Sequence, residues 1–122
     1  MILKNNEYQF ALNYHSTQIN FRIISCGTDG AVYEWEVATG ARVHEQVLKG
    51  TQYTAAVFSP NGKSYASASD GTLREIQEGQ VLRTVDLPAS INGCALSRSG
   101  KLLLCALGKS IFVLFLDFNV EF

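Results

Sequence analysis

The chain has 122 residues, 47% of them hydrophobic and 17% charged, a composition typical of at most one globular domain rather than of a disordered protein. Its formal net charge is −1, and the lysines and arginines stand singly, which excludes the basic stripe that binding of nucleic acid requires. No apolar run has the length of a secretory signal or a membrane span, so we expect a soluble intracellular protein without a membrane partner.

Residues 1–50 begin with a stretch whose structure the sequence hardly indicates and continue with three clear strands. Tyr8–Leu12 is a strand candidate, and Asn13–Asn20 reads as a polar loop in which the lone His15 is expected to be solvated rather than a ligand. The clear strands of this part are 21–26, 31–37 and 41–48.

The segment Ile23–Gly40 reads as strand, turn, strand, turn and holds the single tryptophan of the chain. Within it Tyr33 and Trp35 fall on one face of the second strand and Val32 and Glu34 on the other, the period of two of a half-buried strand. We interpret the aromatic face as the one that packs between neighbouring sheets; the alternative is an exposed anchor for a partner.

The same pattern restarts at Tyr53 and again at Ile91. Gly71 follows Gly30 at an interval of about 40 residues, and Gly100 follows Gly62 at nearly the same interval. A repeat of about 40 residues with four short strands is typical of propeller blades. The strand candidates of the two later passes are 53–59, 63–69, 72–77, 80–87, 91–97, 101–108 and 109–117, with turns at 60–62, 70–71, 78–79, 98–100 and 108–109.

Two Asp-Gly turns, at Asp29 and at Asp70, stand at the same place in two passes, and Trp35 ends the strand that follows the first. These residues, with the turns Ser59–Gly62 and Ser97–Gly100, resemble the WD40-repeat family. The resemblance covers about residues 21–114 and implies an all-β fold. We expect a fragment of a β-propeller with two and a half to three four-stranded antiparallel blades, approximately residues 1–50, 51–90 and 91–122, which do not close a ring.

The chain departs from the family pattern at several positions. Trp35 is followed by glutamate rather than aspartate, Ile76 and Leu114 stand in the place of the tryptophan, and no Gly-His pair precedes Tyr53. The family's network of hydrogen bonds therefore lacks its histidine, while serine, aspartate and tryptophan are present. By the resemblance, the structural blade residues are Ser25, Asp29, Gly30, Trp35, Asp70 and Gly71.

The nonapeptide Gly27–Trp35, together with Val47–Lys49 and Thr72–Ile76, resembles a narrower axonemal group, the cilia- and flagella-associated protein 57 family. This resemblance implies a non-catalytic adaptor near inner dynein arms or their regulators in motile cilia. Its partners would be axonemal proteins and the remaining blades of a longer propeller, and its location the cytoplasm, cytoskeleton and axoneme. The alternatives are a WD40 scaffold outside cilia and a small β-protein with an undetected ligand site.

The end of the chain, residues 112–122, resembles neither a usual blade ending nor the continuation of that family. We therefore expect a truncated, alternatively spliced or mispredicted form of a longer protein. Such a form should have marginal stability and aggregate through Ile111–Phe118, an apolar segment that would be an unpaired edge.

No constellation of residues predicts an enzyme. Asp29 and Asp70 are expected to accept hydrogen bonds from their own turns, and Ser67 and Ser69 lack a positioned histidine. We expect no cofactor and no metal. Partner contacts are instead expected in the two loops that join the blades, whose residues are Lys49, Gly50, Thr51, Gln52, Leu87, Pro88, Ala89 and Ser90.

The three cysteines, Cys26, Cys94 and Cys105, form no C-x-x-C pair and have no histidine at zinc-finger spacing. They are predicted to be buried, reduced thiols. A hairpin folded about Ser99–Gly100 would place Cys94 directly across from Cys105.

Overall fold

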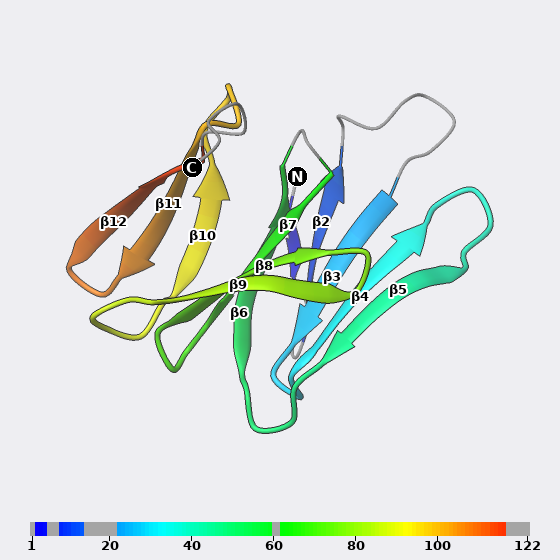
Figure 1. Cartoon of the computed structure of the whole chain (residues 1–122). Coiled ribbons are helices and arrows are strands. Elements are labelled where there is room, and N and C mark those ends of the chain that lie inside the picture. The colour runs from blue at the N-terminus through cyan, green and yellow to red at the C-terminus, as the bar shows by residue number, and fades with distance from the viewer. Residues whose placement is uncertain (1, 5–7, 14–21, 60–61, 117–122) are drawn as a thin grey trace.

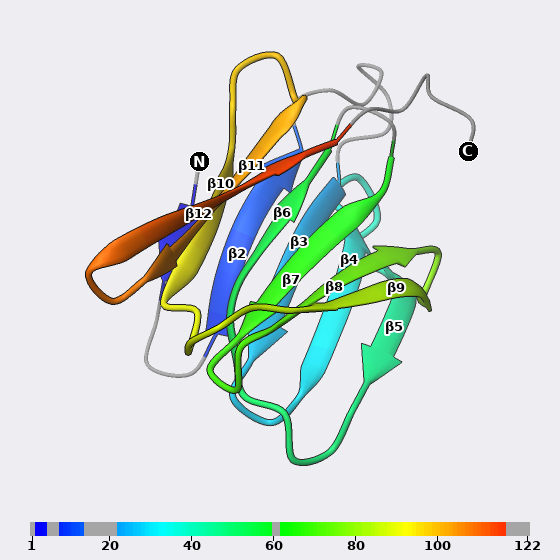
Figure 2. The ribbon, with the colours of Figure 1, turned by 60° about the vertical axis from the view of Figure 1, so that its left-hand side comes forward.

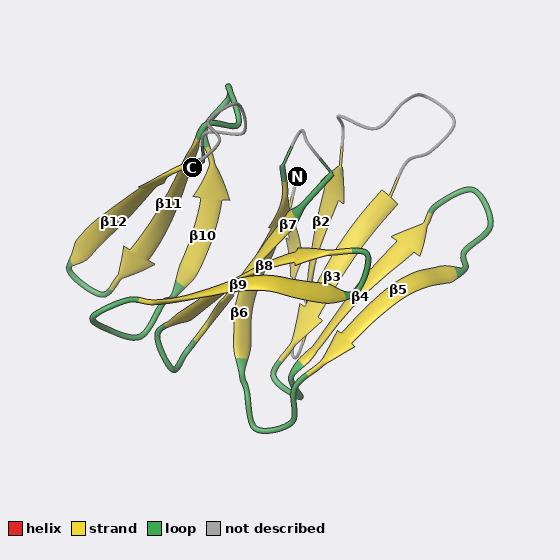
Figure 3. Ribbon diagram, viewed as in Figure 1, coloured by secondary structure: helices red, strands yellow, loops and turns green. Residues whose placement is uncertain are grey.

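A computed structural model of the chain describes residues 2–4, 8–13, 22–59 and 62–116. Within these ranges the protein consists of strands and turns without a helix, so no helix that could cross a membrane is found there (Figure 3). The strands are β1 (Ile2–Lys4), β2 (Tyr8–Asn13), β3 (Arg22–Gly27), β4 (Ala31–Glu36), β5 (Arg42–Val47), β6 (Tyr53–Phe58), β7 (Ser64–Ala68), β8 (Thr72–Gln77), β9 (Gln80–Asp86), β10 (Gly93–Leu96), β11 (Leu102–Leu107) and β12 (Ser110–Phe115).

The strands form three antiparallel sheets in which neighbours along the chain are also neighbours in space. The first sheet has the order β1-β2-β3-β4-β5, the second β6-β7-β8-β9 and the third β10-β11-β12. The second sheet lies between the other two (Figure 1), and the view turned by 60° shows the third sheet in front of it (Figure 2). The predicted all-β fold of repeated hairpins is confirmed, and the strand candidates from residue 21 onward agree with the observed strands within a few residues.

Two differences concern the first and third sheets. The short strand β1, which the sequence did not indicate, adds a fifth strand to the first sheet, and the third sheet has three strands among the described residues. His15, the residues Pro60–Asn61 of a predicted turn, and the end of the chain from residue 117 lie outside the described residues.

Two hydrophobic clusters hold the sheets together, one on each face of the second sheet. Burying a leucine, isoleucine or phenylalanine side chain stabilises the fold by about 1.5–3 kcal/mol relative to leaving it exposed, so these two layers supply much of the stability. Between the first and second sheets the cluster comprises Ile24, Cys26, Val32, Tyr53, Ala56, Phe58, Ala66, Ala68 and Ile76. Between the second and third sheets it comprises Ala55, Val57, Tyr65, Leu73, Leu87, Ile91, Cys94, Leu103, Cys105, Leu107 and Leu116.

The aromatic face of β4 is not the face that packs on the second sheet. Val32 belongs to the cluster between these two sheets and is 4% exposed, whereas Tyr33 and Trp35 are half-buried on the opposite face. The aromatic pair therefore lies outside the contact between the first two sheets, and its packing against another neighbouring sheet stays a prediction. Strand alternation defines two faces, but it does not determine which of them receives the neighbouring sheet.

Candidate protein-interaction site

The first Asp-Gly turn fixes the loop that connects the first sheet to the second. The Asp29 carboxylate accepts a hydrogen bond from the backbone N–H of Ala31 at 3.2 Å, which closes the turn between β3 and β4. The next residue, Gly30, has φ +87°, a conformation that favours glycine. It packs against the loop after β5, where an added Cβ would overlap the carbonyl oxygen of Leu48. The Leu48 N–H donates to the Gly30 carbonyl at 2.8 Å, so the loop and the turn are bound to each other.

The second Asp-Gly turn repeats this arrangement at the equivalent place in the next repeat. The Asp70 carboxylate accepts hydrogen bonds from the backbone N–H of Thr72 at 3.0 Å and from its hydroxyl at 2.6 Å. The hydroxyl is the main reason that the pKa of Asp70 lies below its ordinary value. The carbonyl of Gly71 accepts a hydrogen bond from Leu87 N–H at 2.8 Å, and an added Cβ on this glycine would stand 3.0 Å from the carbonyl oxygen of Ala89.

The two loops predicted to contact partners therefore lie beside the two Asp-Gly turns, at the lower end of the sheets in Figure 1. Thr51 and Leu87 are 7% and 8% exposed and anchor their loops inward. The other predicted contact residues are exposed: Lys49, Gly50, Gln52, Pro88, Ala89 and Ser90. Both loops thus expose short segments whose backbone is held by hydrogen bonds to the turns, and contact of these residues with a partner stays a prediction.

Trp35 and Ser25 form a hydrogen bond across the hairpin of β3 and β4. The indole N–H donates to the serine hydroxyl at 3.0 Å, and the serine is 2% exposed. The Tyr33 ring packs edge-on against the tryptophan at 5.8 Å between ring centroids, and the Arg42 guanidinium lies 4.5 Å from the Tyr33 centroid. This group stabilises the outward face of the first sheet.

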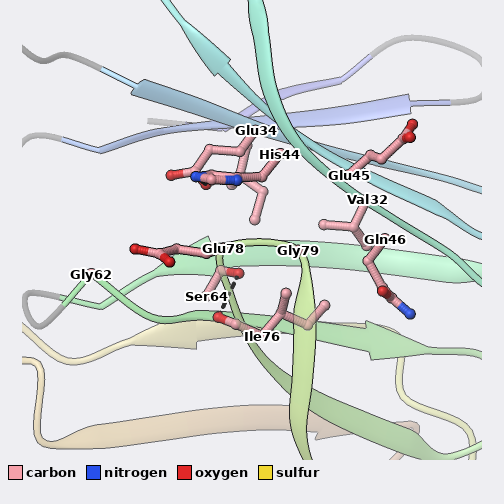
Figure 4. Close-up of a pocket in the computed structure, with 11 residues that line it drawn as sticks. Val32, Glu34, His44, Glu45, Gln46, Gly62, Ser64, Ile76, Glu78 and Gly79 are labelled. Carbon is pink, nitrogen blue, oxygen red and sulfur yellow. Dashed lines mark hydrogen bonds and ion pairs between the residues drawn. The ribbon is translucent and has the colours of Figure 1, made fainter.

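A small hollow opens between the first and second sheets (Figure 4). Glu34 and His44 line it from the first sheet, and Glu78 and Ser64 line it from the second. The cavity has a volume of about 10 Å³, which is enough for about one water molecule. Sites for drug-sized ligands are larger by more than an order of magnitude, with volumes of about 300–1,000 Å³, so the hollow does not suit a substrate of that size.

The charges in the hollow are largely paired within the first sheet. Glu34 accepts from Arg22 at 3.3 Å and lies 3.8 Å from the Nε2 atom of His44. Among the described residues no group of three or more histidine, cysteine, aspartate or glutamate side chains could hold a metal ion. Alternation along the strand predicts Glu34 on the face opposite Trp35, but its ion pairs could not be predicted because they depend on the register of three strands.

A second polar cluster, which was not predicted from the sequence, joins β7 to β8. The hydroxyl of Tyr65, a residue that is 1% exposed, donates to the Glu75 carboxylate at 2.7 Å. Burial of the Tyr65 hydroxyl is the main reason that its pKa is raised. The hydrogen bond to the Glu75 carboxylate and the negative charge of that carboxylate raise the pKa further. Lys63 and Arg83 lie 3.9 and 3.5 Å from the same carboxylate. Alternation along both strands of the predicted hairpin could have indicated that the tyrosine and glutamate share a face.

The three cysteines are buried thiols that form no disulfide bond, as predicted. Cys94 and Cys105 are directly opposite each other in the pairing of β10 with β11, which confirms the predicted hairpin register. Burial raises the pKa of Cys94 to about 12 and also raises the pKa of Cys105. Both thiols are therefore protonated near neutral pH and serve as small apolar side chains rather than nucleophiles.

The repeated turns and sheets agree with a sequence match. The profile of the WD domain, G-beta repeat (WD40) matches residues 43–75, which cover most of β5, all of β6 and β7, and most of β8. The chain therefore contains a WD40 repeat. Proteins with WD40 propellers are typically non-catalytic and mediate interactions between proteins, and the predicted WD40-type propeller fragment is confirmed by this match together with the three antiparallel sheets.

Two further comparisons describe what this WD40-repeat chain is similar to. It is 41% identical over 86 residues to cilia- and flagella-associated protein 57 of Mus musculus. That match covers 67% of the chain but 7% of the mouse protein, so the chain spans a small part of that relative. In structure it is similar to the computationally designed Ika4 protein, with a TM-score of 0.69 and 20% identity over 88% of this chain and 65% of the designed one. The second likeness shows the fold alone.

Proposed function

We propose that the chain is a non-catalytic interaction scaffold of motile cilia, an axonemal adaptor associated with inner dynein arms or their regulators. The similarity over 86 residues to a cilia- and flagella-associated protein is the observation that carries the ciliary part of this proposal. The cytoskeleton of the axoneme is accordingly the proposed location, and axonemal proteins are the proposed partners.

The geometry supports a scaffold because backbone hydrogen bonds hold the exposed loops in place. Each loop is bonded through its backbone to an Asp-Gly turn, by Leu48 N–H to Gly30 and by Leu87 N–H to Gly71. A surface that is ordered before a partner arrives loses little conformational entropy on binding, which favours affinity. Lys49, Gln52 and Ser90 are exposed on these loops, and we propose that they contact the partner.

The proposal is tested by locating the tagged chain in multiciliated cells. The wild-type chain should be found along the axoneme together with a marker of inner dynein arms. A triple variant, Lys49→Ala, Gln52→Ala and Ser90→Ala, should lose this location while its circular dichroism spectrum stays that of the wild type. A folded wild-type chain that is spread through the cytoplasm and excluded from cilia would contradict the ciliary role and favour a WD40 scaffold elsewhere in the cell.

A matched control changes exposed residues at the opposite end of the sheets. Arg98 and Lys101 lie at the connection between β10 and β11 and are exposed, like the residues of the two loops. The double variant Arg98→Ala and Lys101→Ala should keep the axonemal location. If it lost the location as completely as the triple variant, the two loops would not be the contact surface.

A further inference from the structure

Two of the three cysteines lie directly opposite each other in the third sheet. Cys94 on β10 pairs with Cys105 on β11, and both belong to the cluster between the second and third sheets. Cys26 belongs to the other cluster, and the residues directly opposite it are Gln9 and Val32. The strand pairing therefore brings two thiols together and leaves Cys26 outside the pair.

The position of this pair in the ladder suits a covalent bond between the two sulfur atoms. The Ser97 N–H donates to the carbonyl of Leu102, the residue opposite it in the same register, at 2.8 Å. Hydrogen-bonded and non-hydrogen-bonded pairs alternate along an antiparallel ladder, so the cysteines, three positions further along, form a non-hydrogen-bonded pair. The Cα atoms of such a pair are about 4.5 Å apart, within the range of about 4.4–6.8 Å that disulfides require. A disulfide between Cys94 and Cys105 therefore needs little movement of the backbone.

Packing alone does not require thiols at these two positions. Cys105 follows Ser67 at the repeat interval, and the residue directly opposite Ser67 is Ala55. Both of these residues are buried, so the second sheet fills the equivalent space with small side chains that cannot form a disulfide. The opposed thiols are thus a property of the third sheet and not of the repeat.

We propose that Cys94 and Cys105 are a redox-sensitive lock of the third sheet, which closes as a disulfide when glutathione disulfide oxidises the pair. The Cys94 thiolate attacks one sulfur of glutathione disulfide, whose S–S bond breaks and releases one glutathione. The Cys105 thiolate then attacks the Cys94 sulfur and displaces the second glutathione. Two protein thiols are oxidised, one glutathione disulfide is reduced to two thiols, and the two protons pass to the released glutathione. The lock does not depend on the axonemal role.

The surroundings of the two thiols determine the order of these steps. Cys94 is 7% exposed and lies on β10, at one edge of the third sheet, whereas Cys105 is fully buried on β11, between β10 and β12. Burial raises the pKa of both thiols, and a hydrogen bond with Ser67 partly opposes this effect at Cys94. The closed sheet should therefore react slowly, and exchange should begin at Cys94 when β10 transiently detaches.

The test is to incubate the full reduced chain with glutathione disulfide in native buffer, unfold it, block the remaining thiols and map the cross-linked peptides by mass spectrometry. The expected product joins Cys94 to Cys105, and Cys26 is recovered as a blocked thiol. The same incubation in concentrated urea is the control, because an unfolded chain should form cross-links of all three pairings. A native chain that stays reduced, that joins Cys26 to another cysteine, or that stops with glutathione attached would overturn the proposal.

Two single variants test which thiol attacks first. Cys105→Ala keeps Cys94 but lacks the second thiol, so it should accumulate a mixed disulfide of Cys94 with glutathione. Cys94→Ala is the matched control and should stay unmodified at Cys105. Circular dichroism checks that both variants are folded. A mixed disulfide at Cys105 in the control, with none at Cys94 in the first variant, would overturn the assigned order.

The effect of the lock is measured on the wild-type chain and needs no variant. A disulfide that closes the short loop between residues 94 and 105 constrains the open state of the hairpin, so opening of β10 should become rarer on the order of 100-fold. Hydrogen exchange at the amides of β10 and β11 before and after oxidation measures this opening. Equally fast exchange in the reduced and the cross-linked chain would overturn the lock.

Discussion

Replacing Gly30 by alanine tests whether the Asp-Gly turns hold the loops between the sheets. Gly30 has φ +87°, where a residue with a side chain costs about 1–2 kcal/mol. The new Cβ would overlap the Leu48 carbonyl oxygen and stand 3.1 Å from that of Thr51, so the loop must move. The movement breaks the buried hydrogen bond from Leu48 N–H to Gly30, which costs about 1–3 kcal/mol more. The free energy of unfolding should therefore fall by about 2–5 kcal/mol.

Two other glycines provide the controls. Gly50 has φ +90° but has no atom within 4 Å of the position of an added Cβ. Gly50→Ala should therefore lower the free energy of unfolding only by the cost of the unfavourable backbone conformation, about 1–2 kcal/mol. Gly71 is intermediate, because its added Cβ would stand 3.0 Å from the Ala89 carbonyl oxygen. Urea unfolding followed by the fluorescence of Trp35, the single tryptophan, measures all three variants. If Gly30→Ala were no more destabilising than Gly50→Ala, the contact between turn and loop would not be the constraint.

Tyr65→Phe removes the hydroxyl that donates to the Glu75 carboxylate at 2.7 Å, so urea unfolding should show a loss of about 1.5–3 kcal/mol. Tyr53→Phe removes a buried hydroxyl that has no hydrogen-bond partner among the described residues, and it should leave stability unchanged or slightly higher; equal losses in the two variants would contradict the assignment. At Asp70 the hydrogen bond from the Thr72 hydroxyl lowers the pKa, so the carboxylate stabilises the fold above its ordinary pKa of 3.8, and this contribution is lost as pH falls through the lower pKa of the folded state. Thermal unfolding at steps below about pH 4 should then show a smaller loss for Asp70→Asn than for the wild-type chain, whereas parallel curves would refute this.

The residues that carry the candidate site were largely visible in the sequence because their signals are local. Asp70 and Gly71 form a turn because of their own backbone preferences. The equivalent turn at Asp29, one repeat earlier, indicates the repeat. The loop residues between the strands followed from the same spacing. The hydrogen bonds from Leu48 and Leu87 that fix these loops to the turns required the folded chain, because each joins segments that are separated by two whole strands of the sequence.

By itself the sequence determined the strands from residue 21 onward, the hairpins and the repeat, since alternation, glycine turns and spacing act within a few residues of each other. It also predicted that Cys94 faces Cys105, because a hairpin register follows from its turn. Only the tertiary structure decided which face of each sheet is covered. Val32 rather than Trp35 packs on the second sheet, and Ile111 on β12 is left exposed, because burial depends on whether a neighbouring sheet is present and on which side it lies.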